Sequence, residues 1–293
     1  MSQQDDQLKQ IVKDKYGSIA EQDKATNAAS CCGATDVSTK VYNIMMDDYT
    51  AVEGYHADAD LGLGCGLPTQ FAHIQPGDTV IDLGSGAGND CFVARHETGP
   101  TGKVIGIDFT ERMIDKARQN AEKLGYNNVE FRFGDIEAMP VSDNLADVVV
   151  SNCVLNLVPN KAAVIREIFR VLQPGGHFSI SDIVLEGELP EALRKDAELY
   201  AGCVAGAIQM EDYLELIHTQ GFAQVQVQKK KTISLPDDIL AKYLSDDEIR
   251  QFQQGNIGIF SITVYAEKPG EKKAKPKVNL AELNSCDPAS GCC

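Results

Sequence analysis

The sequence predicts an α/β protein with a doubly wound, mostly parallel sheet, to which a C-terminal α+β lobe is appended. Strand-like and helix-like segments alternate from Phe71 onward, and this alternation is typical of a parallel sheet with helices on both faces. Residues 146–150 are almost entirely apolar, as expected for a strand that is covered on both faces. A glycine-rich loop follows the strand at 79–83, where open parallel sheets bind their ligands.

Each element follows from a local pattern of residues. Runs rich in β-branched and apolar residues predict strands, and segments ended by glycine or proline predict helices. Thr110 is placed to cap one helix, and Pro174 with the two following glycines is placed to end another. The expected strands are 79–83, 103–107, 129–133, 146–150, 177–184, 224–230 and 258–267. The expected helices are 8–16, 36–48, 89–96, 111–124, 161–172, 188–206 and 210–220, with a further one that ends near 76–77.

The chain is predicted to have four parts. Residues 1–70 form an N-terminal helical and loop segment that carries Cys31, Cys32 and Cys65, and residues 71–185 form the cofactor-binding domain. Residues 186–267 form the C-terminal lobe. Residues 268–293 are rich in lysine and proline before a cysteine-containing end, and we expect this tail to be disordered.

Charge and composition exclude several classes of function. The chain has 293 residues, a formal net charge of −16 and 43% apolar residues, which suits an enzyme rather than a nucleic-acid-binding protein. The same charge argues against an anionic membrane surface as a partner. The N-terminus lacks the features of a signal peptide, and no apolar run approaches the roughly 18 residues that cross a bilayer. We therefore expect a cytoplasmic protein.

Nine cysteines are the most unusual part of the composition. An odd number excludes a complete disulfide framework, and no CxxC…CxxC spacing indicates structural zinc. Cys65, Cys153 and Cys203 stand in glycine-rich or polar settings, which favours a role as soft ligands. Cys91 lies in an apolar helix and is interpreted as a buried core residue.

The glycine-rich loop indicates an adenosyl cofactor. Asp82, Gly84, Gly86 and Gly88 alternate with other residues directly after a strand, and the spacing differs from the dinucleotide pattern G-x-G-x-x-G. Asp108 ends the next strand, where a carboxylate can bind two ribose hydroxyls.

This pattern resembles class I S-adenosylmethionine-dependent methyltransferases, whose fold is Rossmann-like. The resemblance implies S-adenosylmethionine as the methyl donor. It also implies that the loop after the third strand, around Glu137, flanks the adenine, and that Cys153 lies at the mouth of the site. The implied donor contacts are Asp82, Gly84, Ser85, Gly86, Gly88, Asp108, Phe109, Met113, Ile136, Glu137 and Asn152.

The cysteine segments narrow the resemblance to arsenite S-adenosylmethionine methyltransferases. The resemblance implies that Cys153 and Cys203 bind trivalent arsenic, and that Cys65 joins them or forms a disulfide with Cys31 or Cys32. Cys65, Cys153, Cys203 and Cys32 are thus the expected catalytic thiols. Asn89-Asp90 departs from the residues that family members often carry after the glycine loop. The matching segments are 15–17, 30–33, 61–66, 82–88, 151–157, 181–182 and 200–206.

The implied activity is methylation of arsenite and then methylarsenite in arsenic detoxification, by a monomer that thioredoxin or glutathione reduces after turnover. The resemblance places arsenic binding partly in the lobe at 186–267. Two alternatives stay open: a methyltransferase for another small molecule, and a non-catalytic arsenic-binding thiol protein. For Cys292 and Cys293, the alternatives are inert tail thiols and a tethered pair that captures arsenite.

Overall fold

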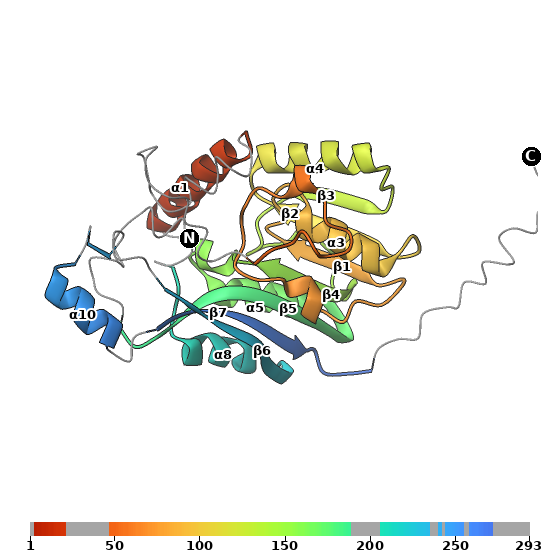
Figure 1. Ribbon diagram of the computed structural model, residues 1–293. Coiled ribbons are helices and arrows are strands. Elements are labelled where there is room, and N and C mark those ends of the chain that lie inside the picture. The colour runs from red at the N-terminus through yellow and green to blue at the C-terminus, as the bar shows by residue number, and fades with distance from the viewer. Residues whose placement is uncertain are drawn as a thin grey trace, which may run out of the picture.

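The computed structural model describes residues 3–21, 47–188, 206–234, 240–241, 244–254 and 258–271 (Figure 1). Within these ranges no helix is long and apolar enough to cross a membrane. Several predictions lie outside them: the helix at 188–206, nearly all of the helix at 36–48 and the tail from 272 onward. The cysteines outside them are Cys31, Cys32, Cys203, Cys286, Cys292 and Cys293.

Seven strands in the described part of the chain form one sheet, in the order β3-β2-β1-β4-β5-β7-β6. The first five are parallel, and β7 pairs antiparallel with both β5 and β6. The residues predicted to form a C-terminal lobe thus contribute β6 and β7 to the same sheet. The strands are β1 (Thr79–Leu83), β2 (Lys103–Asp108), β3 (Val129–Phe133), β4 (Ala146–Asn152), β5 (Leu172–Glu186), β6 (Ala223–Ile233) and β7 (Gly258–Glu267).

Helices cover both faces of this sheet, which confirms the doubly wound prediction. Alternate residues of each strand face opposite ways. Ile81 and Ile105 pack in one cluster with α5 and α8, while Val80 and Val104 pack in another with α3 and α4. The helices are α1 (Gln3–Ile19), α3 (Asn89–Thr98), α4 (Glu111–Leu124), α5 (Lys161–Val171), α8 (Met210–Thr219) and α10 (Asp246–Gln254). Short 3-10 turns are η1 (Ala57–Ala59), η2 (Pro68–Phe71) and η3 (Leu155–Leu157).

Two details of the predicted secondary structure are wrong. No α-helix ends near residues 76–77, since the described stretch from residue 47 to β1 contains only the 3-10 turns η1 and η2. The strand predicted at 177–184 begins earlier, at Leu172, and runs through Pro174. The pairing of β4 with β5 shifts register between Ala146 and Val148, and Gly175 has a φ of +77°. The proline and the glycines therefore lie in a β-bulge. They end helix α5 but do not interrupt strand β5.

Helix α1 lies across the carboxyl edge of the sheet, beside α4 (Figure 1). Lys116 of α4 donates to the carbonyl of Ala20 at 2.8 Å, and Ile19 packs in a cluster with Met113. Val12 is fully buried, in the cluster that contains Cys65. The N-terminal helix is therefore part of the wall around the ligand-binding edge.

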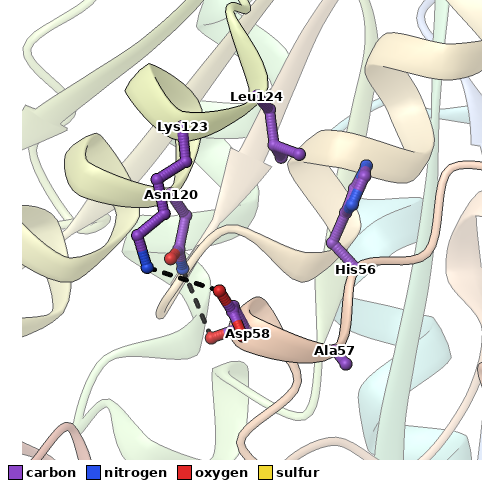
Figure 2. Close-up of a pocket in the computed structure, with 6 residues that line it drawn as sticks. All are labelled: His56, Ala57, Asp58, Asn120, Lys123 and Leu124. Atoms are coloured by element: carbon purple, nitrogen blue, oxygen red, sulfur yellow. Dashed lines mark hydrogen bonds and ion pairs between the residues drawn. The ribbon is translucent and has the colours of Figure 1, made fainter.

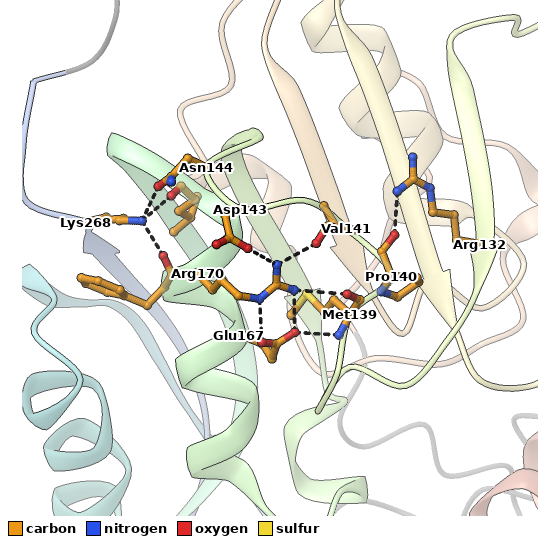
Figure 3. A network of polar contacts seen from close by, with 11 residues as sticks. Arg132, Met139, Pro140, Val141, Asp143, Asn144, Glu167, Arg170 and Lys268 are labelled. Carbon is orange, nitrogen blue, oxygen red and sulfur yellow. Dashed lines mark hydrogen bonds and ion pairs between the residues drawn. The ribbon is translucent and has the colours of Figure 1, made fainter.

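Arg170 of α5 fixes the loop that follows β3 (Figure 3). Its guanidinium donates to the carbonyls of Val141 at 2.7 Å and Met139 at 3.1 Å. It also pairs with Glu167 and Asp143, each at 2.7 Å. Hydrogen bonding from Arg170 lowers the pKa of Glu167, so the pair stays charged over the working pH range. The loop that follows β3 is thus attached to α5.

We expect Arg170→Met to lower the free energy of unfolding by about 1–3 kcal/mol, because it leaves two backbone carbonyls and a half-buried carboxylate without their donor. Arg250→Met is the matched control, since Arg250 pairs with Asp247 at the same helical spacing but has a side chain that is 64% exposed. That control should lose no more than about 1 kcal/mol. Urea denaturation measures both changes, and equal losses would contradict the role given to Arg170.

Candidate active site

The glycine-rich loop joins β1 to α3 at the carboxyl edge of the sheet. It lies where the strand order switches between β1 and β4, the position at which open α/β sheets bind ligands. Gly84 has a φ of +64°, and a Cβ built on it would lie 2.5 Å from the side chain of Val154. Only glycine fits at this position, which keeps the backbone of the loop open to a ligand.

Asp108 stands at the end of β2 and faces the loop. Its side chain accepts a hydrogen bond from the Gly86 amide at 3.0 Å and one from the Thr110 amide at 2.8 Å. Burial raises the pKa of Asp108, and these backbone hydrogen bonds partly oppose that rise. The carboxylate is therefore held in one orientation beside the glycine loop, as the prediction of a ribose contact requires.

Four of the predicted donor contacts line a narrow cleft. Phe109 and Ile136 line it together with Gly84 and Asp108, and Met113 is buried beneath the loop. Ser85 Oγ is buried without a hydrogen-bond partner among the described residues. Along the cleft, a fixed carboxylate and an apolar wall supply the polar and apolar contacts that a nucleoside with its ribose hydroxyls requires.

Asp82 lies deeper than the other predicted contacts. It is 2% exposed and accepts a weak hydrogen bond from the Cys91 thiol at 3.2 Å. Burial and then the charge of Asp90 raise the pKa of Asp82 well above its usual value. Cys91 is fully buried in the core cluster of α3, which agrees with its interpretation as a core residue.

Glu137 is held by a lysine that the sequence patterns did not single out. Lys9 of α1 reaches Glu137 at 2.5 Å and Asp135 at 2.6 Å, and Glu137 also accepts the Asn160 amide at 2.9 Å. Burial alone would lower the pKa of Lys9, but the two carboxylates outweigh it and raise the pKa. Lys9 also lines the narrow cleft, which has a volume of about 20 Å³.

A second cavity of about 250 Å³ lies between η1 and the end of α4 (Figure 2). Asn120 of α4 lines it and donates to the carbonyl of Ala87 at 3.1 Å and to that of Asp58 at 3.4 Å. Lys123 pairs with the exposed Asp58 side chain at 3.3 Å. Asn120 thus connects the glycine loop, at Ala87, to η1, at Asp58, and the sequence patterns did not single it out.

Asn152, predicted to contact the donor, directs its side chain to the loop that carries Cys65. Its Oδ1 accepts a hydrogen bond from the Cys65 amide at 2.9 Å. The next residue, Cys153, donates its amide to the Ser181 carbonyl at 2.7 Å and has a left-handed backbone, with a φ of +62°. The structure therefore brings the Cys65 loop and the end of β4 into direct contact.

Cys65 and Cys153 lie in one apolar cluster at the carboxyl edge. Cys65 is fully buried and Cys153 is 5% exposed. Leu157 and Ile183 pack in the same cluster, and Phe109 of the donor cleft packs against it. Two of the three predicted arsenic ligands thus lie together beside the donor cleft. Within the described ranges, no group of three or more His, Cys, Asp or Glu side chains could hold a metal ion.

Two further polar side chains are buried next to these thiols. The Tyr213 hydroxyl lies 3.5 Å from Asp182 Oδ2. Burial, the charge of Asp182 and the nearby Cys65 and Cys153 together raise the pKa of Tyr213 well above its usual value. Burial also raises the pKa of Asp182 to about 7. Asp182 belongs to a segment already singled out by resemblance, whereas no sequence signal pointed to Tyr213.

Known proteins resemble this chain in fold and, over most of its length, in sequence. Residues 74–221 match a family model described as a methyltransferase domain. An arsenite methyltransferase of Halobacterium salinarum is 40% identical over 90% of this chain and 67% of its own length. One from Aquipseudomonas alcaligenes is 32% identical over 82% of this chain and 69% of its own length. The crystal structure of an arsenic(III) S-adenosylmethionine methyltransferase from Chlamydomonas reinhardtii has a TM-score of 0.60 and 30% identity, covering 80% of this chain and 76% of that one.

The sheet order, the glycine loop and the donor cleft define a class I S-adenosylmethionine-dependent methyltransferase. The two arsenite methyltransferases are similar enough to this chain, over enough of their length, to define its family within that class. The chain belongs to the arsenite methyltransferase family.

Proposed function

We propose that the protein methylates trivalent arsenic, first arsenite and then methylarsenite, with S-adenosylmethionine as donor. The observation that carries the proposal is the placement of Cys65 and Cys153 in one buried cluster beside the donor cleft. Cys203 is the proposed third ligand, and it lies outside the described residues. The names of the relatives support arsenic as the substrate.

The chemistry of the cysteine thiols accounts for the binding of arsenite. Arsenous acid is neutral, so the acidic protein does not repel it, and arsenic(III) is soft enough to prefer sulfur. Three thiols exchange with its three hydroxyl groups, and each thiol proton leaves with a hydroxyl as water. The resulting thiolate complex has no net charge, which suits the apolar surroundings of Cys65 and Cys153.

The arrangement of the cysteines beside the donor cleft favours catalysis by positioning of arsenic relative to the methyl group. S-adenosylmethionine, when bound, supplies an electrophilic methyl group on its sulfonium. The cysteines hold arsenic with its lone pair free, so no general base is required, and the sheet edge fixes the direction of approach. Gly84, Asp108 and Ile136 would hold the nucleoside, and Ser85 would donate to it.

Methylation raises the formal oxidation state of arsenic by two. We propose that two of the site thiols form a disulfide and so return two electrons to arsenic. Cys65 with Cys31 or Cys32 is one such pair, and thioredoxin or glutathione would then reduce the disulfide.

Arsenic speciation after incubation with arsenite, S-adenosylmethionine and a thiol tests this function. Methylated arsenic that forms only when all three are present supports it. Donor consumption that does not depend on arsenite would indicate another small-molecule substrate. Arsenite binding without turnover would indicate an arsenic-binding thiol protein.

Cys65→Ser should stop the methylation of inorganic arsenite but retain that of methylarsenite. A methylated arsenic has one fewer position for a thiolate, so Cys153 and Cys203 suffice to hold it. Initial rates with each substrate measure the split, and the methylarsenite rate serves as the internal control for folding. Wild-type rates with both substrates would mean that Cys65 is not a ligand.

A further inference from the structure

The Asn152 side chain is fixed in one orientation at the end of β4. The Cys65 amide can only donate, so the atom 2.9 Å from it must be the carboxamide oxygen of Asn152. Asn152 Nδ2 then faces the Tyr49 hydroxyl at 2.6 Å and the Gly66 carbonyl at 2.9 Å. One side chain therefore binds the Cys65 amide, the Gly66 carbonyl and the Tyr49 hydroxyl.

Tyr49 connects this contact to the donor side of the site. Its hydroxyl donates to the Asp90 carboxylate, whose oxygens lie 2.8 and 2.9 Å away. Asp90 lies in the first turn of α3, directly after the glycine loop, and its carboxylate is also 3.2 Å from Asn152 Nδ2. Tyr49 and Asp90 are both buried, at 2% and 8% exposed, so solvent does not compete for these hydrogen bonds.

The Cys65 loop also makes close contacts on both sides. A Cβ built on Gly64 would lie 2.8 Å from Asn152 Nδ2, and one built on Gly66 would lie 2.5 Å from Ser181 Oγ. The Ser261 hydroxyl of β7 donates to the Cys65 carbonyl at 2.5 Å. The backbone of Cys65 is therefore held by hydrogen bonds at both its amide and its carbonyl.

We propose that Asn152 is a positioning residue for arsenic, which sets the place of the Cys65 thiol relative to that of Cys153. Asn152 and Cys153 are consecutive, so the same short segment carries one thiol and holds the backbone of the other. The proposal rests on the proposed function. It assigns the Asn152 side chain to the part of the site that binds arsenic, whereas resemblance alone assigned it to the part that binds the methyl donor.

The physical reason for a positioning residue such as Asn152 is preorganisation of the loop that carries Cys65. Arsenic(III) requires its ligands at fixed angles, and a loop that must first be ordered reduces the affinity. Arsenite needs all three thiols, whereas methylarsenite needs only the two that Cys153 and Cys203 supply. Loss of the Asn152 contacts should therefore weaken the binding of arsenite selectively.

Asn152→Ala in the full-length enzyme tests this inference, with ligand binding followed by thiolate-to-arsenic absorbance and donor binding by calorimetry. We expect the Kd for arsenite to rise about tenfold or more, because a buried amide loses its acceptor. The Kd values for methylarsenite and for S-adenosylmethionine should change less than about threefold. Tyr49→Phe keeps the Asn152 contact with Cys65 and removes one of its supports, so it should show the same selectivity with a smaller rise.

Asn128→Ala is the matched control. Asn128 also donates to two backbone carbonyls, those of Gly99 at 3.0 Å and Gly102 at 2.9 Å, but lies away from both halves of the site. It should leave the ratio of the arsenite and methylarsenite affinities unchanged. A purely structural role for Asn152 would likewise lower stability without changing that ratio, and this result would overturn the inference.

Two other outcomes separate the inference from the proposed function. If Asn152→Ala weakens donor binding and leaves arsenite binding intact, Asn152 is a donor contact and the inference is wrong. Cys65→Ser is measured in the same assay. If it loses arsenite affinity while Asn152→Ala and Tyr49→Phe do not, the inference fails and the proposed function stands. If Cys65→Ser binds arsenite as the wild type does, the proposed role of Cys65 fails.

Discussion

Cys153→Ser should reduce the rate of arsenite methylation at least about 100-fold, because arsenic would lose a ligand that fixes it in line with the methyl group. Serine has nearly the same volume as cysteine, and its hard oxygen is a poor ligand for arsenic(III). The buried Cys153 side chain packs with Leu157 and Ile183, and the isosteric change should preserve this packing. Arsenic speciation over time measures the rate.

Two comparisons make the result specific. Donor affinity should stay close to wild type, since no donor contact is assigned to the Cys153 thiol. Cys203→Ser should give the same loss, and Cys286→Ser, which removes a thiol from the predicted tail, should keep the wild-type rate at saturating arsenite. Normal turnover in either Cys153→Ser or Cys203→Ser would exclude the assigned ligand set.

Asp108→Asn should weaken the binding of S-adenosylmethionine by about 1.5–3 kcal/mol, equivalent to roughly a tenfold to 150-fold rise in Kd. The carboxylate is held between the Gly86 and Thr110 amides and faces the position assigned to the ribose. Amide replacement keeps the shape and removes the charge that strengthens hydrogen bonds to the hydroxyls. Calorimetry with the donor measures the change.

Asp115→Asn is the control, because Asp115 is on α4 with a side chain that is 70% exposed and should not affect donor binding. Arsenite binding should be unchanged in both variants. An equal loss of arsenite and donor affinity in Asp108→Asn would instead indicate that the domain has partly unfolded.

Local sequence patterns were sufficient to predict the parallel core of this fold. The strand and helix alternation and the glycine loop predicted β1 to β4 within one or two residues, and β7 at its observed bounds. The start of β5 was missed because Pro174 and the two glycines after it normally end regular structure, whereas here they lie in a bulge supported by β4.

Without the resemblance, which supplied contacts such as Phe109 and Ile136, the candidate site was predictable only where a residue carries its own chemical signal. Cys65, Cys153 and Asp108 have such signals, and the structure places them at one edge of the sheet. Lys9 and Tyr213 have none, because a lysine or a tyrosine in an amphipathic helix looks like any other. Their contacts depend on pairings of residues far apart in the chain, such as the 126 positions between Lys9 and Asp135.

The left-handed backbone at Cys153 restricts which side chains could be installed there in a redesign of the site. Asparagine, aspartate and histidine are enriched several-fold in this conformation, whereas β-branched residues are strained in it. Substitutions with aspartate or histidine would therefore supply ligands for harder ions without strain in the backbone of residue 153. Valine or threonine would have to shift the backbone first. At position 153, side chains that carry oxygen or nitrogen ligands are thus accommodated more readily than β-branched side chains.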